Sequence, residues 1–325
     1  MEPLAACDPS GQSAVAWATD CWYLTGPTAS GKKGIGIELA LQLGAEIVSL
    51  DSMTLYREMD VGTAKPKPEQ RARVPHHLLD ILSPTEEFSL SNYVDAARDA
   101  TTEIRSRGRE VLFVGGTPLY LKALLRGIFQ GPPADWEFRR EVAREVEQVG
   151  LAALYERLAQ VDPLSAAKLH PHDQRRIIRA LEVYRLTGRP ISHLQTQFDE
   201  GAPAERRRVF VLGWLREELH RRIDERVELM FAAGFVDEVR GILARHRALS
   251  RTAAQAVGYR EVIDHLQGRS DLAATIVAVK ARTRQFARRQ ETWFRSLTEC
   301  RFVPQHEGEA DATVAQRILQ LAGAA

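Results

Sequence analysis

Cysteine and long apolar runs are scarce in this chain of 325 residues. Its three cysteines, Cys7, Cys21 and Cys300, are far apart, which excludes a disulfide scaffold or a cysteine-based zinc site and is typical of a reducing compartment. No segment approaches the roughly 18 consecutive apolar residues of a membrane-spanning helix. Residues 1–20 contain no lysine or arginine and so lack the basic start of a signal peptide. We therefore expect a cytoplasmic protein with a disordered leader over residues 1–20.

Net charge is also nearly absent, at +1, but it is unevenly distributed. Residues 1–100 contain 8 basic and 14 acidic side chains, whereas residues 101–325 contain 36 basic and 29 acidic ones. An acidic part followed by a basic part indicates that the second part binds a polyanion. Arginine-rich helix faces that only contact solvent produce the same imbalance.

Short apolar segments alternate with helical patterns before residue 130. Such alternation predicts βαβ units and a parallel sheet, which places the chain in the α/β class. The expected strands are 21–25, 45–50 and 110–114, and the expected helices are 31–43, one capped by Ser89 or Ser91 that runs to about Arg107, and one that begins at Pro118.

The pattern becomes almost wholly helical from Trp136 to Phe198, with a linker expected at 199–203. A strand returns at Val209–Gly213, and a long amphipathic helix with apolar residues at i+4 spacing follows it through Phe235. Because the strand indicates a return to the first sheet, the helical block is interpreted as an insertion. The expected domains are a core of 21–135 with 205–300, an insertion of 136–204 and a tail of 301–325.

The segment Gly26–Lys32 reads GPTASGK and matches the phosphate-loop pattern G-x-x-x-x-G-K. A predicted strand precedes it and a predicted helix follows it. Backbone N–H groups of such a loop converge on phosphate oxygens, and the helix N-terminus adds its positive end. A strand–turn–helix without any ligand is the alternative. The residues expected to bind a diphosphate are Gly26, Pro27, Thr28, Ala29, Ser30, Gly31, Lys32 and Lys33.

The residue after Lys32 departs from this pattern. A phosphate loop ordinarily has Ser or Thr there, whose hydroxyl binds Mg²⁺, whereas this chain has Lys33. A protonated lysine has no lone pair with which to bind a metal. Three alternatives follow: substrate oxygens and water hold Mg²⁺, Lys33 replaces part of its charge, or the site is impaired. No protein ligand is therefore assigned to the metal.

Two further polar residues follow predicted strands. Asp51 follows the second strand and Thr117 the third. Because ligands bind at the carboxyl ends of parallel strands, both side chains should converge with the phosphate loop on one crevice. A carboxylate there is able to accept a proton from an attacking group. A helix cap or a solvated turn is the alternative role of Asp51.

Several long motifs, in order and with ordinary spacing from about Tyr23 to Leu297, resemble those of tRNA dimethylallyltransferases. After GPTASGK come DSMTLYREMDVGTAKP at 51–66, PHHLLDILSP at 75–84, VGGTPLY at 114–120, DQRRIIR at 173–179, RIDERVELMFAAGFVDEV from Arg222, VGYR at 257–260 and TRQFARRQETWFR at 283–295.

The resemblance implies a Mg²⁺-dependent transfer of dimethylallyl from its diphosphate to the N6 amine of an adenine. That adenine lies immediately 3′ of the anticodon in tRNAs that read codons beginning with U. The implied fold is a P-loop NTPase-like core with an inserted all-helical domain that grips the anticodon stem-loop. In this chain Asp51 would orient or deprotonate the amine, Lys32 and Arg226 would hold the diphosphate, and Thr117 would position the base or the diphosphate.

The same resemblance implies that the partners are a tRNA anticodon stem-loop and dimethylallyl diphosphate, and we expect a monomer that contacts no membrane. The implied tRNA contacts are Asp51, Ser52, Met53, Thr54, Thr117, Arg139, Gln174, Arg175, Arg176, Ile177 and Ile178. Alternative functions are an adenylate isopentenyltransferase, a tRNA-binding homologue impaired by Lys33, and a P-loop kinase. His76 and His77 have no third metal ligand at suitable spacing and are expected to be structural.

Overall fold

The computed structural model describes residues 16–129, 131–195 and 201–323, which form two compact units. The α/β unit takes its described residues from Met1–Leu125 and Gly201–Ala325, and the helical unit takes them from Arg126–Glu200. Both boundaries fall earlier in the chain than residues 136 and 204, where the sequence pattern places them. Among the described helices, none combines the length and hydrophobicity that crossing a bilayer requires.

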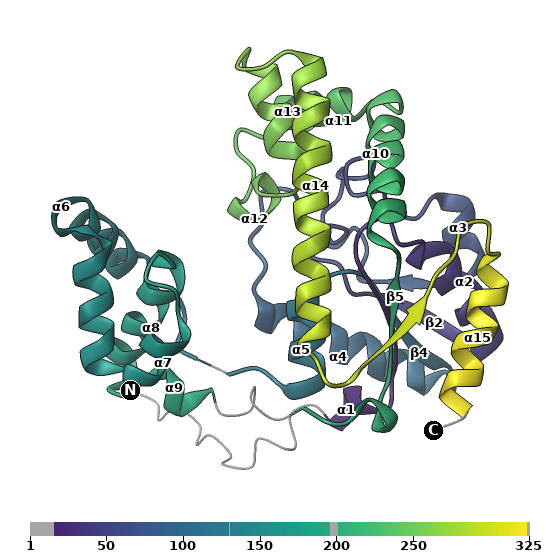
Figure 1. The fold of residues 1–325 in the computed structure, drawn as a ribbon, viewed down its shortest axis with the longest axis horizontal. Helices are drawn as coiled ribbons and strands as arrows, with labels where there is room; N and C mark the ends of the chain where they lie inside the picture. The colour runs from purple at the N-terminus through teal and green to yellow at the C-terminus, as the bar shows by residue number, and fades with distance from the viewer. Residues whose placement is uncertain (1–15, 130, 196–200, 324–325) are drawn as a thin grey trace. The chain divides into compact units, whose positions relative to one another are not determined.

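A parallel sheet forms the centre of the α/β unit and confirms the predicted fold class (Figure 1). Among the described residues it has six strands, in the order β3-β2-β4-β1-β5-β6. The strands are β1 (Trp22–Thr25), β2 (Ala45–Ser49), β3 (His76–His77), β4 (Glu110–Val114), β5 (Arg208–Gly213) and β6 (Cys300–Pro304).

The chain returns to this sheet after the helical unit, as the sequence pattern predicts. Strand β5 pairs with β1 in parallel, with Leu24 opposite Phe210. On the other side of β1, Leu24 lies opposite Val114 of β4. Strands β1, β2 and β5 are buried along almost their whole length, as expected for a parallel sheet covered on both faces.

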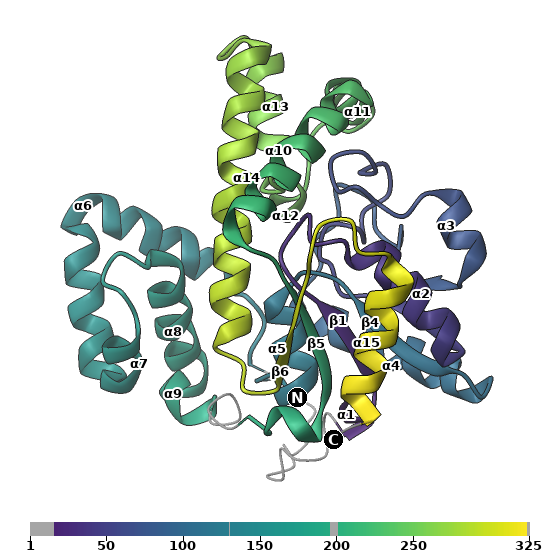
Figure 2. The same ribbon diagram turned by 45° about the vertical axis from the view of Figure 1, so that its right-hand side comes forward.

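Successive residues of each strand point to opposite faces of the sheet. On one face Leu24 and Leu112 belong to a core cluster with α2 (Lys32–Leu43) and α15 (Asp311–Gly323). On the other face Tyr23 stacks on Phe113, with ring centroids 5.1 Å apart. Figures 1 and 2 show α15 lying beside α2.

Both ends of the α/β unit contain structure where the sequence pattern indicates none. Helix α15 buries Val314, Ala315 and Ile318 against the sheet, and β6 pairs with β5, so residues 301–323 belong to the core and are not a tail. Residues 1–15 of the expected leader lie outside the described residues. Its last part forms α1 (Ala16–Thr19), in which Ala18 is buried, so the leader is not disordered throughout.

The remaining helices of the α/β unit include a group that stands at one end of the sheet (Figure 1). The predicted long helix through Phe235 is two helices, because Gly234 adopts a left-handed φ of 91° and ends the first one. The bounds are α3 (Pro68–Arg73), α4 (Leu90–Ser106), α5 (Pro118–Arg126), α10 (Arg216–Ala232), α11 (Phe235–Arg245), α12 (Arg251–Ala254), α13 (Tyr259–Leu266) and α14 (Leu272–Arg295), with a 3₁₀ turn at Ala204–Arg206.

The helical unit packs its helices around a core of its own. Phe138, Leu158 and Leu181 are among the buried residues of that core. Its longest helix bends at Gly150, whose φ of 84° and ψ of 161° are not helical. The helices are α6 (Trp136–Val161), α7 (Pro163–Lys168), α8 (Gln174–Thr187) and α9 (Ile191–Leu194).

Candidate active site

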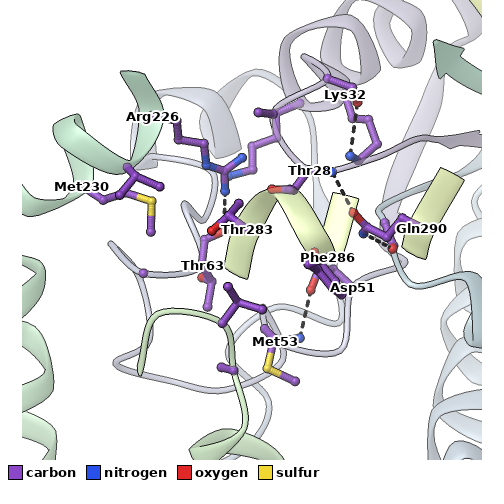
Figure 3. A pocket seen from close by; sticks show the side chains of 18 of the residues that line it. Thr28, Lys32, Asp51, Met53, Thr63, Arg226, Met230, Thr283, Phe286 and Gln290 are labelled. Carbon is purple, nitrogen blue, oxygen red and sulfur yellow. Dashed lines mark hydrogen bonds between the residues drawn. The ribbon is translucent and has the colours of Figure 1, made fainter. Parts of the chain in front are cut away.

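A cavity of about 770 Å³ opens in the α/β unit where the loops after β1, β2 and β4 come together (Figure 3). The phosphate loop, Asp51 and Thr117 line it, and so does Arg226 from α10. The structure thus brings the four residues that were expected to be catalytic, Lys32, Asp51, Thr117 and Arg226, to one site.

The phosphate loop connects β1 to α2 in a strained backbone path. Gly31, just before α2, has a φ of 90°, which favours glycine. The Lys32 ammonium folds back over the loop and donates to the carbonyl oxygens of Gly26 and Pro27, at 2.8 and 2.6 Å. From the other side, Trp214 Nε1 donates to the Ser30 carbonyl at 3.1 Å and Arg222 Nε donates to that of Ala29 at 3.0 Å. The loop is therefore held in a fixed shape around an ammonium group.

A buried glutamine joins the phosphate loop to the loop after β4. Gln290 of α14 accepts from the Thr28 amide at 2.9 Å and donates to the Gly116 carbonyl at 2.5 Å. Thr283, Phe286 and Gln290 all line the cavity, and their spacing places them on one face of α14 (Figure 3). Gln290 is not among the site residues predicted from the sequence, although this spacing is visible there.

Lys32, Lys33 and Arg226 concentrate positive charge on the cavity. Burial, reinforced by the nearby charge of Arg226, lowers the pKa of both Lys32 and Lys33 to about 7. Burial also lowers the pKa of Arg226, against the attraction of Asp51. Such a cluster is costly without an anion and favours binding one.

Asp51 lies two residues after the end of β2, and its Oδ1 accepts from the Met53 amide at 2.9 Å. This bond closes the turn that was the alternative role of Asp51. Only one carboxylate oxygen takes part in it, so the other is available to a ligand in the cavity that Asp51 lines. Thr117 Oγ1 accepts from the Ser52 amide at 3.0 Å, which ties the loops after β2 and β4 together. Thr54 is buried, with its hydroxyl 2.7 Å from that of Ser49, so its side chain does not face a ligand.

The loop at residues 60–63 is held by a carboxylate that is also not among the residues predicted from the sequence. Glu238 of α11 accepts from the backbone amides of Asp60, Val61 and Gly62, at 2.8, 2.6 and 3.1 Å. The hydroxyl of Tyr259 donates to the same carboxylate at 2.7 Å. This loop in turn presents the Thr63 carbonyl to Arg226 Nη2 at 3.4 Å. A glutamate whose partners are mostly backbone amides leaves no motif to recognise.

Apolar side chains also line the cavity, among polar ones. Met230 lies one helical turn after Arg226 on α10, and Met53 and Phe286 come from other elements (Figure 3). Val227 and Val257 also line the cavity. A cavity that is lined by both cations and apolar side chains suits a ligand that has an anionic end and a hydrocarbon end.

The histidine pair has structural partners, as expected. His77 Nε2 lies 2.6 Å from Glu46 Oε2, and His76 Nδ1 lies 2.7 Å from the Val74 carbonyl. Across the described ranges of the chain, no group of three or more His, Cys, Asp or Glu side chains is arranged to hold a metal ion.

The predicted tRNA contacts of the helical unit fall into two classes. Gln174, Arg175 and Arg176 begin α8, where both arginines are exposed. Ile177 and Ile178 are buried in the core of the unit, on the apolar face of the amphipathic helix α8, which does not support a contact of their side chains with tRNA.

Arg139 also has a structural partner within the helical unit. Its Nε and Nη2 donate to Glu182 at 2.7 and 2.8 Å, and Arg179 donates to the same buried carboxylate. The Asp135 amide adds a bond of 2.8 Å. The guanidinium of Arg139 is therefore committed to Glu182, which does not support its predicted contact with tRNA.

Known proteins resemble the chain along most of its length. A model of the IPP transferase family matches residues 54–297. The chain is 48% identical over 305 residues to a tRNA dimethylallyltransferase of Rhodopirellula baltica, with 91% of each chain covered. It is 45% identical over 287 residues to a tRNA dimethylallyltransferase of Geobacter metallireducens, with 88% of this chain and 93% of that one covered.

Solved structures agree with this result. A full-length tRNA isopentenylpyrophosphate transferase from Bacillus halodurans is 36% identical, with a TM-score of 0.68 over 93% of this chain and 95% of that one. A eukaryotic dimethylallyltransferase acting on tRNA is 25% identical, with a TM-score of 0.74 over 93% of this chain and 78% of that one. From the family model and these relatives, we conclude that the chain belongs to the IPP transferase family.

Proposed function

We propose that this protein transfers the dimethylallyl group of dimethylallyl diphosphate to the N6 amine of the adenine immediately 3′ of the anticodon, in tRNAs that read codons beginning with U. The observation that carries the proposal is the cavity itself, which combines cations, one carboxylate after β2 and an apolar lining. The relatives named above act on tRNA or carry names that say so, and a prenyl diphosphate has the anionic and hydrocarbon ends that this cavity suits.

The donor's diphosphate would bind at the phosphate loop. Backbone amides at the start of α2 point toward phosphate oxygens in such loops, and the helix dipole favours negative charge there. Lys32 and Arg226 line the same cavity and would add charge-assisted hydrogen bonds. The dimethylallyl group would then lie against Met230 and Phe286.

In the reaction, the lone pair of the adenine N6 attacks C1 of the dimethylallyl group while the bond from C1 to the diphosphate oxygen breaks. The electron pair of that bond leaves with the diphosphate. N6 loses a proton, which the Asp51 carboxylate accepts. Negative charge that develops on the leaving oxygen is stabilised by the loop amides, Lys32 and Arg226. Thr117, bonded to the Ser52 amide, holds the Asp51 turn in place.

The residues present do not fit the Mg²⁺ that the family resemblance implies. The loop position that ordinarily supplies a hydroxyl ligand holds an ammonium group, Lys33. The described part of the chain offers no cluster of metal-binding side chains in its place. No step of the mechanism above therefore passes through a metal ion.

The acceptor would be held by positive charge. Arg175 and Arg176 are exposed at the start of α8 and would contact phosphates of the anticodon stem-loop. Because an enzyme cannot alkylate a base that remains stacked, the adenine must leave its stack to reach Asp51.

Incubation of the purified full chain with dimethylallyl diphosphate and a tRNA that reads a U-initial codon tests the proposal. Nucleoside analysis should detect N6-isopentenyladenosine, and a tRNA with a different base at that position serves as control. Absence of product with and without Mg²⁺ contradicts the proposal. Preferential prenylation of AMP would identify an adenylate isopentenyltransferase, and tRNA binding with no turnover would identify an impaired homologue.

A further inference from the structure

Lys33 is placed where its ammonium group is able to act on the ligand. It is the second residue of α2, directly after the phosphate loop. Its side chain lines the main cavity together with Asp51 and Arg226. It also lines an adjoining cavity of about 60 Å³ with Ser49 and His76. This position has the same relation to the loop as the hydroxyl that binds Mg²⁺ in other phosphate loops.

Lys33 forms no ion pair among the described residues. Within the described ranges, no hydrogen bond or salt bridge of Lys33 with another side chain is present. Lys65 is a contrasting case, because its buried ammonium lies 2.6 Å from Asp60 and 2.5 Å from Asp80. The charges of Arg226, Lys32 and Arg71 lower the pKa of Lys33, and the charge of Asp51 opposes them. Glu225 and Asp311 also line the main cavity. An excess of positive charge of this kind is stabilised by an anionic ligand.

A diphosphate is the anion that matches this excess. Its terminal phosphate carries about −1.5 to −2 at neutral pH, and the inner phosphate adds a further charge. Lys32, Lys33 and Arg226 line one cavity, and they carry three positive charges once a bound anion keeps both lysines protonated. A lysine acts on a phosphate as a point charge with three donors, so it is able to neutralise an oxygen that a divalent ion would otherwise bind.

We propose that the ammonium group of Lys33 takes the place of Mg²⁺ beside the donor's diphosphate, so that this chain binds and uses its donor without a divalent metal ion. The inference rests on the proposed function for the identity of the donor. It resolves the three alternatives for Lys33 in favour of charge replacement, and it concerns a residue in which this chain departs from the phosphate-loop pattern.

Binding of inorganic pyrophosphate to the full chain, measured by calorimetry, tests the inference without catalysis. Each protein is titrated in EDTA and in Mg²⁺. We expect the wild type to bind equally within about threefold in the two buffers. Lys33→Thr should restore the hydroxyl and bind at least tenfold more tightly with Mg²⁺, and Lys33→Met should lose at least tenfold in EDTA. Lys67→Met, which removes an exposed lysine, is the matched control and should behave as the wild type.

A wild-type affinity that falls tenfold or more when Mg²⁺ is removed overturns the inference. Circular dichroism of each variant shows whether it is folded before it is titrated. The same four proteins are then assayed for prenyl transfer in both buffers, where the wild type should keep its rate in EDTA within about threefold. A Lys33→Thr rate in Mg²⁺ more than tenfold above that of the wild type also overturns it.

The two proposals fail in different ways. If pyrophosphate binds without metal but no variant prenylates tRNA in either buffer, the proposed function is wrong and the anion site stands. If tRNA is prenylated only in the presence of Mg²⁺, the function stands and the role of Lys33 is wrong.

Discussion

Each unit contains a cluster of cations around a carboxylate. In the helical unit Glu182 forms ion pairs with Arg139 and Arg179. In the α/β unit the charge of Asp51 acts on the three cations of the cavity, which are Lys32, Lys33 and Arg226. Glu182 is fully buried and accepts bonds from both guanidinium groups and from a backbone amide. Burial would raise its pKa, but these bonds lower it overall. In the α/β unit the cations themselves have lowered pKa values because burial is not matched by anions.

The comparison separates two uses of buried charge. A charge whose partners are all inside the protein stabilises the fold, and breaking the pair leaves the partner uncompensated. A charge that lacks partners destabilises the free protein and is retained where a ligand provides them. The arginines around Glu182 therefore indicate structure, and the cations around Asp51 indicate a binding site. Substitutions in the two clusters should have different consequences.

The largest effect is expected from Asp51→Ala. If Asp51 accepts the N6 proton, the substitution should lower turnover by about 10²–10⁴-fold. The KM for dimethylallyl diphosphate should change little, because the cations that bind it remain. Steady-state prenylation of tRNA measures both constants, and Asp99→Asn, at an exposed carboxylate, is the control. A loss of turnover below tenfold would mean that Asp51 only closes its turn with Met53.

Glu182→Ala should act on stability. The substitution removes the carboxylate that pairs with Arg139 and Arg179, and breaking a buried ion pair in this way lowers the free energy of unfolding by about 3–5 kcal/mol. Urea unfolding followed by circular dichroism measures the loss. Glu145→Ala is the matched control because the pair that Glu145 forms with Arg157 is exposed, and exposed pairs contribute about 0–1 kcal/mol. Equal losses in the two variants would remove the distinction between the clusters.

Much of the fold was predictable because it depends on local patterns. The strands β1, β2, β4 and β5 are each four residues or longer and contain short apolar runs, and they form the parallel sheet that was expected. Strand β3 has only two residues, both histidines, and β6 lies at the edge of the sheet with Phe302 39% exposed. Neither has the buried apolar run by which strands were identified.

Other features depend on contacts between distant residues. The apolar spacing continues across Gly234 because Phe231 and Phe235 pack edge to face on the two sides of the helix break. Gln290 and Glu238 bond backbone groups more than 150 residues away in sequence, at Thr28 and Asp60. Arg139 and Arg175 look alike in sequence, and only the structure shows that one of them is paired.

Stability should depend on pH through the cations of the cavity. Burial and Arg226 lower the pKa of Lys33 to about 7 from 10.5, so between these values the unfolded chain binds a proton that the folded chain lacks. The free energy of unfolding should therefore rise as the pH increases from about 7. Other charged groups that act on Lys33 are Asp51, Lys32 and Arg71, and His76 lines the small cavity beside it.

Lys33→Met should reduce the increase of the unfolding free energy with pH by the contribution of about one proton. It should also stabilise the free protein at pH 7. Urea unfolding at pH 7, 8 and 9 measures the slope, with Lys67→Met as control. Saturating pyrophosphate should stabilise the wild type most at pH 7, where the ligand keeps the ammonium charged. Parallel pH profiles for wild type and Lys33→Met would show that Lys33 is not buried near like charge.

The smallest effect is expected from the exposed cations of the helical unit. Arg175→Ala and Arg176→Ala should each weaken tRNA binding severalfold. Each should also reduce the slope of log affinity against log salt concentration by about one, as expected for the loss of one phosphate contact. Turnover at saturating tRNA should stay close to that of the wild type, and so should stability, because neither side chain is buried. Arg185→Ala, at another exposed position of α8, is the control. Filter binding at several salt concentrations measures the slope. If the two variants lost turnover but kept their affinity, the exposed start of α8 would act on catalysis. Exposed cations would then not separate RNA binding from chemistry in this molecule.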